Sequence, residues 1–275
     1  MKMQIGRTAC VAALAAVTAF TLASTVYADL PTIISSFRMS GTAPPYARGI
    51  VLYGPRGVFF LRDSYNYLYT FNTSGSLIST ARLPGAVRLG DADGPPEGYP
   101  SYCFAVVDEA ALNVKIYTTS GSYVGTLFAV APKTVGIGIG GHLARHIYTV
   151  TEEGVVSRYT PYGSFVGSYA TGVKAADVAA AYGYKYMWGD YIYVGPAQEY
   201  EPIRVYDMRF GCSLAGSFTV PGLTNAGAVV GGGTTTIFYW NLRRMGAEIW
   251  AYQTVAAALM AVHPASLGRV KALFK

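Results

Sequence analysis

Short runs of alternating apolar and polar residues recur along this chain, and each follows an aromatic residue and a tight turn. Full copies occupy residues 71–80, 117–126, 159–168 and 206–218, and a half-copy occupies 249–252. The turn in each full copy contains a glycine, which supplies the positive φ that such a turn requires, and an apolar pattern of period two is typical of strands. The pattern therefore predicts a β-hairpin in each copy.

The anchoring residues of these copies stand at positions 71, 117, 159, 206 and 252, so the unit repeats every 42 to 47 residues. Self-similarity at this period, with several short strands in each unit, is the signature of a β-propeller. We predict an all-β protein with five blades of four antiparallel strands each. A ring of six blades is the alternative.

Two further strands are predicted before each hairpin. The middle strands are rich in aromatic and β-branched residues, whose large side chains fill the space between facing sheets. Glycine-rich segments at 136–141 and 227–233 suit innermost strands that crowd around an axis. No helical period follows these glycines, so a phosphate-binding loop is not expected there. The predicted middle strands are 58–61, 102–106, 147–150, 191–194 and 237–240.

The unmatched ends of the repeat predict how the last blade is completed. Residues 33–38 end like the fourth strand of a blade but follow no hairpin, whereas 248–252 resembles a third strand with no partner after it. Pairing these two segments would remove two open sheet edges. We therefore predict that the N-terminal strand closes the last blade. The competing partner is the alternating run 270–274.

The first 28 residues have the pattern of a bacterial secretory signal peptide. Lys2 and Arg7 precede an apolar run from Ala9 to Val26, and the small residue Ala28 precedes the expected cleavage point. A membrane anchor is the alternative, because the apolar run is close to spanning length. We expect a protein with no stable membrane span after cleavage, secreted to the periplasm or the extracellular space.

Three segments are therefore predicted: a signal peptide at 1–28, one propeller domain at 29–253, and a tail or edge strand at 254–275. Removal of Lys2 and Arg7 lowers the formal net charge from +6 to +4. The remaining excess lies mainly in the last residues of the chain, so the body is close to neutral. A nucleic-acid-binding protein needs a clustered basic surface, and no nucleic-acid partner is expected.

Two cysteines, Cys103 and Cys212, remain in the exported part. An oxidising compartment favours a disulfide between such a pair. They fall in the second and fourth units, however, with a whole unit between them, and a disulfide needs Cα atoms within about 7 Å. Separate thiols are the favoured prediction, and a disulfide is the alternative.

One acidic segment is the best candidate for a metal site. Asp91, Asp93 and Glu97 resemble part of a calcium-binding loop, which places carboxylates at alternate positions beside a glycine turn. Calcium is therefore the one cofactor considered. Pro95 and Pro96 interrupt the pattern, so a plain acidic turn with no cofactor is the favoured prediction, and calcium binding is the alternative.

The histidines do not assemble a catalytic set. His142 and His146 are four residues apart, which on a helix would place two metal ligands on one face. The segment 145–150 is predicted to be a strand, however, in which residues four apart are separated by about 13 Å. We therefore assign no catalytic residue.

Ligand binding is expected at aromatic residues in or near the connections between strands, at one end of the ring. Tyrosine and tryptophan rings present an apolar face and a polar tip, and they can stack on sugars. Core packing is the favoured prediction for each ring taken alone, and shared exposure of several rings would instead indicate a binding surface. The candidate ligand-binding residues are Tyr99, Tyr102, Tyr182, Tyr184, Tyr186 and Trp188.

The repeats resemble the NHL and YncE-like group of exported propellers, and more loosely the virginiamycin B lyase-like propellers. The residues that carry this resemblance are the hairpins with their Gly-Ser turns and the Pro-Gly linkers at 83–85 and 220–222. The resemblance covers nearly all of 29–253 and implies an architecture, often of six blades, without implying a ligand. The ending 266–274 is similar to short basic tails on exported bacterial proteins.

Two functions agree with these observations. The first is a non-catalytic binding or structural module for an extracellular protein or glycan, with self-assembly or a surface assembly as a further role. The second is a metal-dependent lyase or hydrolase of the same fold, which needs at least three converging ligands. We predict the first, because the sequence supplies no catalytic set.

Overall fold

A computed structural model describes thirteen segments of the chain. Among these, the backbone alone is described at 32–38, 49–53, 58–62, 181–184, 187–188, 227–231, 236–241 and 248–253. The predicted signal peptide 1–28 and the tail 254–275 lie outside the described residues, as does His142. The described segments are 32–38, 49–53, 58–62, 66–72, 76–86, 88–140, 146–184, 187–198, 201–209, 211–218, 227–231, 236–241 and 248–253.

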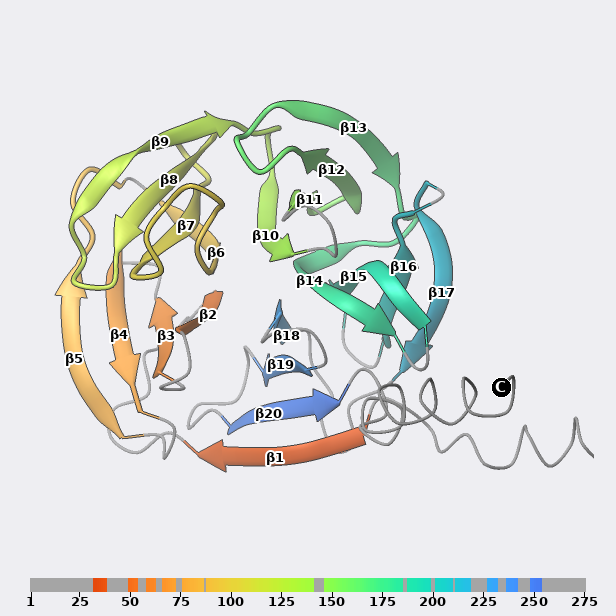
Figure 1. Cartoon of the computed structure of the whole chain (residues 1–275), viewed down its shortest axis with the longest axis horizontal. Helices are drawn as coiled ribbons and strands as arrows, with labels where there is room; N and C mark the ends of the chain where they lie inside the picture. Colours follow the sequence, from red (N-terminus) through yellow and green to blue (C-terminus); the bar gives the residue numbers. More distant parts are fainter. Residues whose placement is uncertain are drawn as a thin grey trace, which may run out of the picture. The chain divides into compact units, whose positions relative to one another are not determined.

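Within the described segments, the chain forms five antiparallel sheets of four strands each (Figure 1), which we number as blades 1 to 5. Blade 1 holds β2 (Gly49–Tyr53), β3 (Val58–Arg62), β4 (Tyr67–Phe71) and β5 (Leu77–Arg82). Blade 2 holds β6 (Leu89–Asp93), β7 (Cys103–Asp108), β8 (Asn113–Thr118) and β9 (Tyr123–Ala129). Blade 3 holds β10 (Thr134–Gly140), β11 (His146–Thr151), β12 (Val155–Tyr159) and β13 (Phe165–Ala170).

Blade 4 holds β14 (Ala175–Tyr184), β15 (Met187–Pro196), β16 (Ile203–Asp207) and β17 (Ser213–Phe218). Blade 5 holds β18 (Gly227–Gly231), β19 (Thr236–Asn241), β20 (Glu248–Gln253) and, as its fourth strand, β1 (Thr32–Arg38). Within blade 5, Ser36 of β1 pairs with Trp250 of β20, and Phe37 pairs with Ile249. This is the strand pairing that the unmatched ends of the repeat predicted.

The first strand of each blade lies next to the first strands of neighbouring blades, in the order β2, β6, β10, β14 and β18, with β18 again next to β2 (Figure 1). In blades 2 and 3 these strands run in the same direction, because Asp91 and Asp93 of β6 meet Ile137 and Ile139 of β10 in the same order. The glycine-rich β10 is therefore an inner strand, as its sequence predicted.

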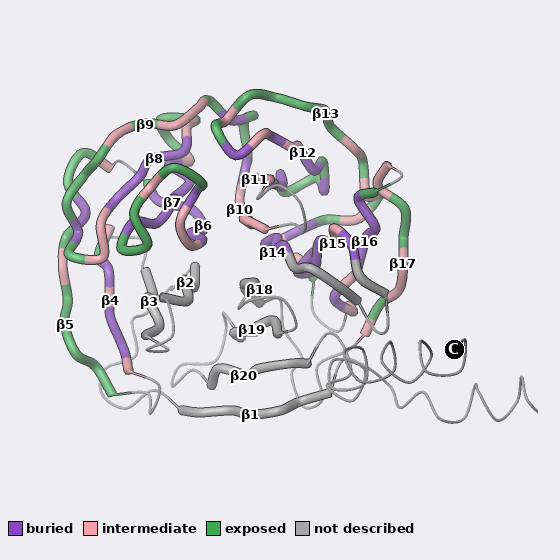
Figure 2. Tube along the Cα trace, in the orientation of Figure 1, coloured by how far each residue is buried: buried purple, intermediate pink, exposed green. Residues whose placement is uncertain are grey.

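Where the structure describes side chains, large aromatic residues of the second and third strands pack in clusters that join neighbouring blades, as predicted for the middle strands of blades 2 and 3. The most deeply buried of them come from β4, β7, β8, β11 and β15, and each is less than 2% exposed: Phe71, Phe104, Tyr117, Tyr148, Tyr191 and Tyr193. Figure 2 shows exposed residues along the outer strands β5, β9, β13 and β17 and buried residues along β7 and β8. The core thus lies between the blades rather than along the outer strands.

In blades 1 to 4, the predicted hairpins join the third and fourth strands. Their turn glycines have positive φ, 89° at Gly121 and 87° at Gly163, which is the conformation that glycine adopts without steric cost. Hydrogen bonds across the turns, such as that from the Thr118 backbone N–H to the Ser122 carbonyl, complete each hairpin. Local turn chemistry is therefore what fixes the period of the repeat.

Two other predictions can be compared with the structure. Cys103 and Cys212 are both free thiols, in agreement with their positions in different blades. Among the described residues, no helix is long and apolar enough to cross a membrane.

Candidate functional site

The connections after the first and third strands of a blade emerge at the same end of that blade, because those two strands run in the same direction. The neighbouring inner strands β6 and β10 run parallel. Gly136 and Gly138 of β10 approach Val178 and Ala180 of β14 in the same order, so β14 is parallel as well. The connections β6–β7, β12–β13 and β14–β15 therefore share one end of the molecule, which we call the loop end.

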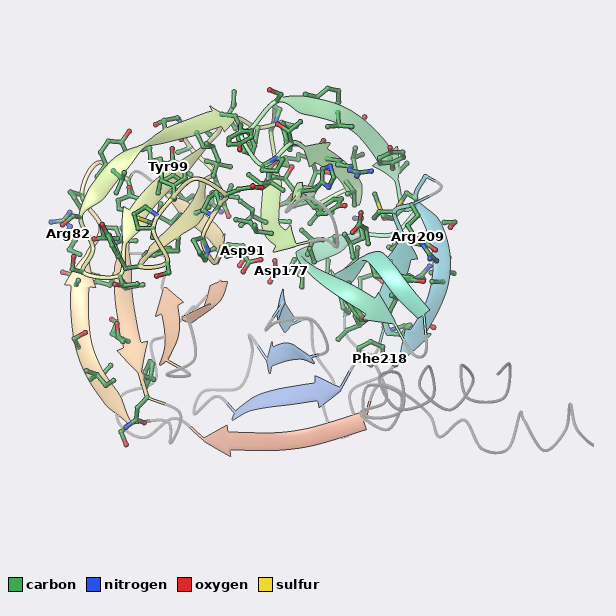
Figure 3. The ribbon with its side chains drawn as sticks, viewed as in Figure 1. Arg82, Asp91, Tyr99, Asp177, Arg209 and Phe218 are labelled. Atoms are coloured by element: carbon green, nitrogen blue, oxygen red, sulfur yellow. The ribbon has the colours of Figure 1, made fainter. Side chains whose placement is uncertain are left out.

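Tyr99 and Tyr102 lie at the loop end, in the connection 94–102 between β6 and β7. The side chain of Tyr102 is 49% exposed, and its carbonyl accepts a hydrogen bond of 2.7 Å from the Thr119 backbone N–H. Tyr99 is half-buried, because it packs against the cluster that contains Cys103 and Tyr159. Of these two predicted ligand-binding residues, Tyr102 is the one with a largely accessible ring; Figure 3 labels Tyr99.

The sequence did not single out Tyr162, which is 70% exposed in the turn between β12 and β13. A Cβ atom on Gly98 would lie 3.8 Å from the ring of Tyr162, so this ring sits beside the connection that carries Tyr99 and Tyr102. A signal was present in the repeat: Tyr162 occupies the position that serine holds in two other hairpins, at Ser74 and Ser120.

A stack of aromatic rings lies on the two strands that flank the turn of Tyr162 and on the neighbouring β9. The rings of Phe128 on β9 and Tyr159 on β12 are stacked, with centroids 4.2 Å apart, and Phe165 meets Tyr159 edge to face at 5.7 Å. The stack joins blades 2 and 3, and its last member, Phe165, is 63% exposed. The loop end therefore presents exposed rings of Tyr102, Tyr162 and Phe165 on a packed aromatic base.

The other four predicted aromatic residues come from the β14–β15 hairpin. Tyr182 and Tyr184 belong to β14 and Trp188 to β15, where Tyr182 pairs with Asp190 and Tyr184 with Met187. The sequence placed them in or near a connection, and the structure places these three in the strands beside the tip of the hairpin. Their side chains and the whole of Tyr186 lie outside what the structure describes.

The predicted calcium ligands are divided between a strand and a loop. Asp91 and Asp93 are buried in β6, whereas Glu97 is exposed in the connection that follows. The carboxylate of Asp91 accepts a hydrogen bond of 2.8 Å from the Ile137 backbone N–H, and that of Asp93 accepts one of 2.6 Å from Ile139. These three carboxylates do not form a group of metal ligands, and no such group of three occurs elsewhere in the described segments. Calcium binding stays an untested alternative.

A second buried carboxyl group meets Asp91 beside the inner strands. Asp177 on β14 hydrogen-bonds with Asp91, and Figure 3 shows both residues near the inner strands. Burial raises the pKa of Asp91 well above its usual value, and the negative charge and hydrogen bond of Asp177 raise it further. Two carboxylates this close disfavour charge on both, so the raised pKa of Asp91 favours its protonated form.

No family model matches this chain, and no curated protein matches it. Solved structures with a similar chain path include the crystal structure of BBS1N in complex with ARL6DN (TM-score 0.44, 14% identity, 74% of this chain and 63% of that chain). Another is the structure of U3-55K (TM-score 0.45, 10% identity, 74% of this chain and 67% of that chain). Both TM-scores lie below 0.5, so neither likeness says anything about what this chain binds or does.

The described strands define an all-β protein built from four-stranded antiparallel sheets, arranged as in a β-propeller. The class is defined by the sheets themselves, because each takes four strands from one repeat unit, apart from blade 5, whose last strand is β1.

Proposed function

We propose that this protein is an exported, non-catalytic β-propeller of five blades that binds an extracellular glycan at its loop end. The observation that carries the proposal is the exposure of Tyr102, Tyr162 and Phe165 at one end of blades 2 and 3. Large rings are usually buried in proteins, and exposed ones that gather in one place commonly mark a binding surface.

The chemistry of these rings favours a sugar. An aromatic face stacks on the apolar C–H face of a sugar ring, while the tyrosine hydroxyl remains free to bond to sugar hydroxyls. The backbone of both tyrosines is held in place. The carbonyl of Tyr102 accepts a hydrogen bond from the Thr119 backbone N–H, and Tyr162 directly precedes the turn glycine Gly163. Rings held in this way lose little freedom on binding, which lowers the entropic cost.

Export is supported by the basic start and apolar run before Ala28, and the hairpin repeats support an NHL-like propeller. A five-bladed ring closed by β1 is supported by the pairing of Ser36 with Trp250 and by the circuit of inner strands. A role in a bacterial surface assembly agrees with the same features. In this role, the protein binds a glycan that is either free or attached to a partner protein. Self-assembly of further copies of this chain then adds binding sites.

The direct test is a glycan array followed by calorimetric titration of the glycans retained. We expect Tyr102→Ala and Tyr162→Ala each to weaken binding between about twofold and tenfold, which is the loss that removal of one stacked ring produces. Tyr67→Ala is the matched control, because Tyr67 is also exposed but begins β4 at the opposite end. Binding that survives both loop-end substitutions would exclude this surface as the glycan site.

No observation favours the alternative of a metal-dependent lyase or hydrolase. In the segments that the structure describes, no three His, Cys, Asp or Glu side chains gather to hold a metal ion. Elemental analysis of protein purified without chelators tests this alternative, which requires a stoichiometric metal.

A further inference from the structure

Three polar side chains occupy one face of blade 3, on the side toward blade 4. His146 and Tyr148 alternate along β11 and so share a face, and Tyr148 is directly paired with Arg158 on β12. The guanidinium Nη2 of Arg158 lies 3.2 Å from Nδ1 and 3.0 Å from Nε2 of His146. The rings of His146 and Tyr148 have centroids 6.3 Å apart. We call His146, Tyr148 and Arg158 the blade 3 polar cluster.

Two atoms of this cluster are buried without a hydrogen-bond partner. Tyr148 is only 1% exposed, yet its hydroxyl bonds to none of the described residues, and the same holds for Nε of Arg158. Nearly all buried polar atoms in proteins are paired, and an unpaired one is costly. Such an atom therefore points to a partner beyond the described residues.

Both atoms are able to donate a hydrogen bond. The guanidinium of arginine carries only N–H donors, so Nε cannot accept a hydrogen bond. Burial raises the pKa of Tyr148 far above its usual value, so its hydroxyl keeps its proton and can donate. The missing partner is therefore an acceptor, and beside the positive charge of Arg158 an anionic acceptor is favoured most.

Arg158 carries the positive charge of the blade 3 polar cluster, and groups of blade 4 surround it. Its Nη1 donates a hydrogen bond of 3.4 Å to the Met208 carbonyl of blade 4. Asp190 and Cys212 also face Tyr148 from blade 4, and the rise in the pKa of Tyr148 that burial causes is increased by the negative charge of Asp190. Burial raises the pKa of Cys212 to about 11, so this thiol is neutral at physiological pH.

The cluster and the exposed rings lie on the two sides of one blade, at the same end. Tyr159 follows Arg158 directly and points toward blade 2, where it stacks on Phe128. Tyr162 stands four residues beyond Arg158, in the turn that follows β12. His146 and Arg158 are only half-buried, so the cluster can be reached from outside.

We propose that the blade 3 polar cluster binds an anionic group, a carboxylate or a sulfate ester, on the glycan held by the loop-end rings. The inference rests on the proposed function and narrows it to acidic glycans. Tyr148 and Arg158 donate to the anionic oxygens, and His146 orients the guanidinium of Arg158.

The probes are tetragalacturonate, its neutral methyl ester, and a sulfated galacto-oligosaccharide, each titrated calorimetrically into the full protein. We expect the anionic probes to bind about tenfold to a hundredfold more tightly than the methyl ester, as hydrogen bonds to charged groups produce. Tighter binding of tetragalacturonate identifies a uronate, and tighter binding of the sulfated probe identifies a sulfate ester. Equal binding of all three probes would overturn the inference.

Two variants assign any such preference to the cluster. Tyr148→Phe removes only the unpaired hydroxyl, so it should fold normally and lose most of the preference for the anionic probe. Arg158→Gln should lose the preference as well. Tyr206→Phe is the matched control, because the hydroxyl of Tyr206 already donates to the Thr171 carbonyl and its loss should not alter the preference. A preference that Tyr148→Phe leaves intact would contradict the inference.

Failure of this inference can be distinguished from failure of the proposed function. If Tyr102→Ala and Tyr162→Ala weaken binding of the methyl ester while anionic probes show no advantage, only the inference about the cluster is wrong. If anionic probes depend on Tyr148 and Arg158 but not on the loop-end rings, the cluster is confirmed and the aromatic surface is excluded.

Discussion

The glycines of β10 determine how closely blades 3 and 4 can approach. A Cβ atom on Gly136 would lie 2.7 Å from the Val178 backbone nitrogen, and one on Gly138 would lie 2.8 Å from that of Ala180. Both distances are shorter than real Cβ contacts, and the atoms met are backbone atoms that cannot turn aside. The absence of a side chain at these two positions is therefore a packing requirement.

We predict that Gly138→Ala lowers the free energy of unfolding by about 1–3 kcal/mol, because the added methyl group overpacks the junction of two inner strands. Gly125→Ala is the control: it also lies in a strand, but nothing comes within 4 Å of its added Cβ. Urea denaturation of the three proteins measures the difference. Equal midpoints for the two variants would show that the inner strands separate without cost.

The Asp91–Asp177 pair predicts a dependence of stability on pH. The pKa of Asp91 is raised on folding, so between about pH 4 and its folded pKa the folded state binds more protons than the unfolded state. Stability contributed by the proton on Asp91 is therefore present at low pH and is lost as the pH rises through the folded pKa. The loss is at most about 1.4 kcal/mol for each pH unit.

Asp91→Asn should flatten this dependence and raise stability at pH 7, because an amide can donate to Asp177 without taking up a proton. Its oxygen can still accept the hydrogen bond from Ile137. Unfolding midpoints measured from pH 4 to pH 8 test the expectation, with the exposed Glu97→Gln as a control for the loss of one negative charge. A variant with the wild-type slope would show that Asp91 does not hold this proton.

The sequence predicted the wrong local structure for these acidic residues for a clear physical reason. Aspartate is disfavoured in strands, and two aspartates followed by a glycine are typical of a loop. In the structure Asp91 and Asp93 satisfy the free backbone N–H groups at the edge of β10, on residues 46 positions later in the chain. This separation is one repeat unit, and only the register between neighbouring blades reveals it.

At the scale of elements, the linkers between blades are held by buried side chains of the third strand. Lys115 on β8 forms an ion pair of 2.7 Å with Asp108 and also donates to the Gly85 carbonyl. Next to it, the hydroxyl of Tyr117 donates to the Pro84 carbonyl at 3.0 Å. The Pro-Gly linker is thus fixed by hydrogen bonds from the blade that follows it.

We predict that Lys115→Met lowers the free energy of unfolding by about 3 kcal/mol, because it leaves the fully buried Asp108 without its cation. The backbone N–H groups of Ala110 and Ala111 still bond to Asp108, which places the loss at the lower end of the range for buried pairs. Thermal or urea denaturation measures it.

Lys133→Met provides the comparison, because it breaks the exposed pair between Lys133 and Glu153 and should leave the unfolding midpoint unchanged. If Lys115→Met behaved like Lys133→Met, the linker would not depend on this ion pair.

The elements themselves were largely predictable from the sequence. Hairpin turns and alternating strands are set by contacts within about ten residues, so the positive φ of Gly121 and Gly163 and the middle strands could be read directly. The extent of β14 and β15 could not be predicted, because Tyr184 and Met187 pair at a tip whose sequence resembles an irregular connection. The polar cluster of His146, Tyr148 and Arg158 depends on cross-strand pairing and could not be read from spacing alone.

At the scale of the whole molecule, the same repeat unit supplies both the blades and the surfaces between them. In the described clusters, middle-strand rings of blades 2 and 3 pack against a neighbouring blade, so a blade at an open end would expose such rings to water. The pairing of β1 with β20 joins the two ends of the described chain within blade 5. The ends are then coupled through every blade between them.

This coupling leads to the final prediction, which concerns truncation. Deletion of residues 29–39 removes β1, exposes the edge of β20 and should unfold the domain cooperatively, because blade 5 would retain only three strands. Deletion of 265–275 should cost little, because it leaves all four strands of blade 5 in place. Circular dichroism and thermal denaturation of the two truncated proteins measure the difference. If the C-terminal deletion unfolded the protein and the N-terminal deletion did not, the competing run 270–274 would be the strand that completes blade 5.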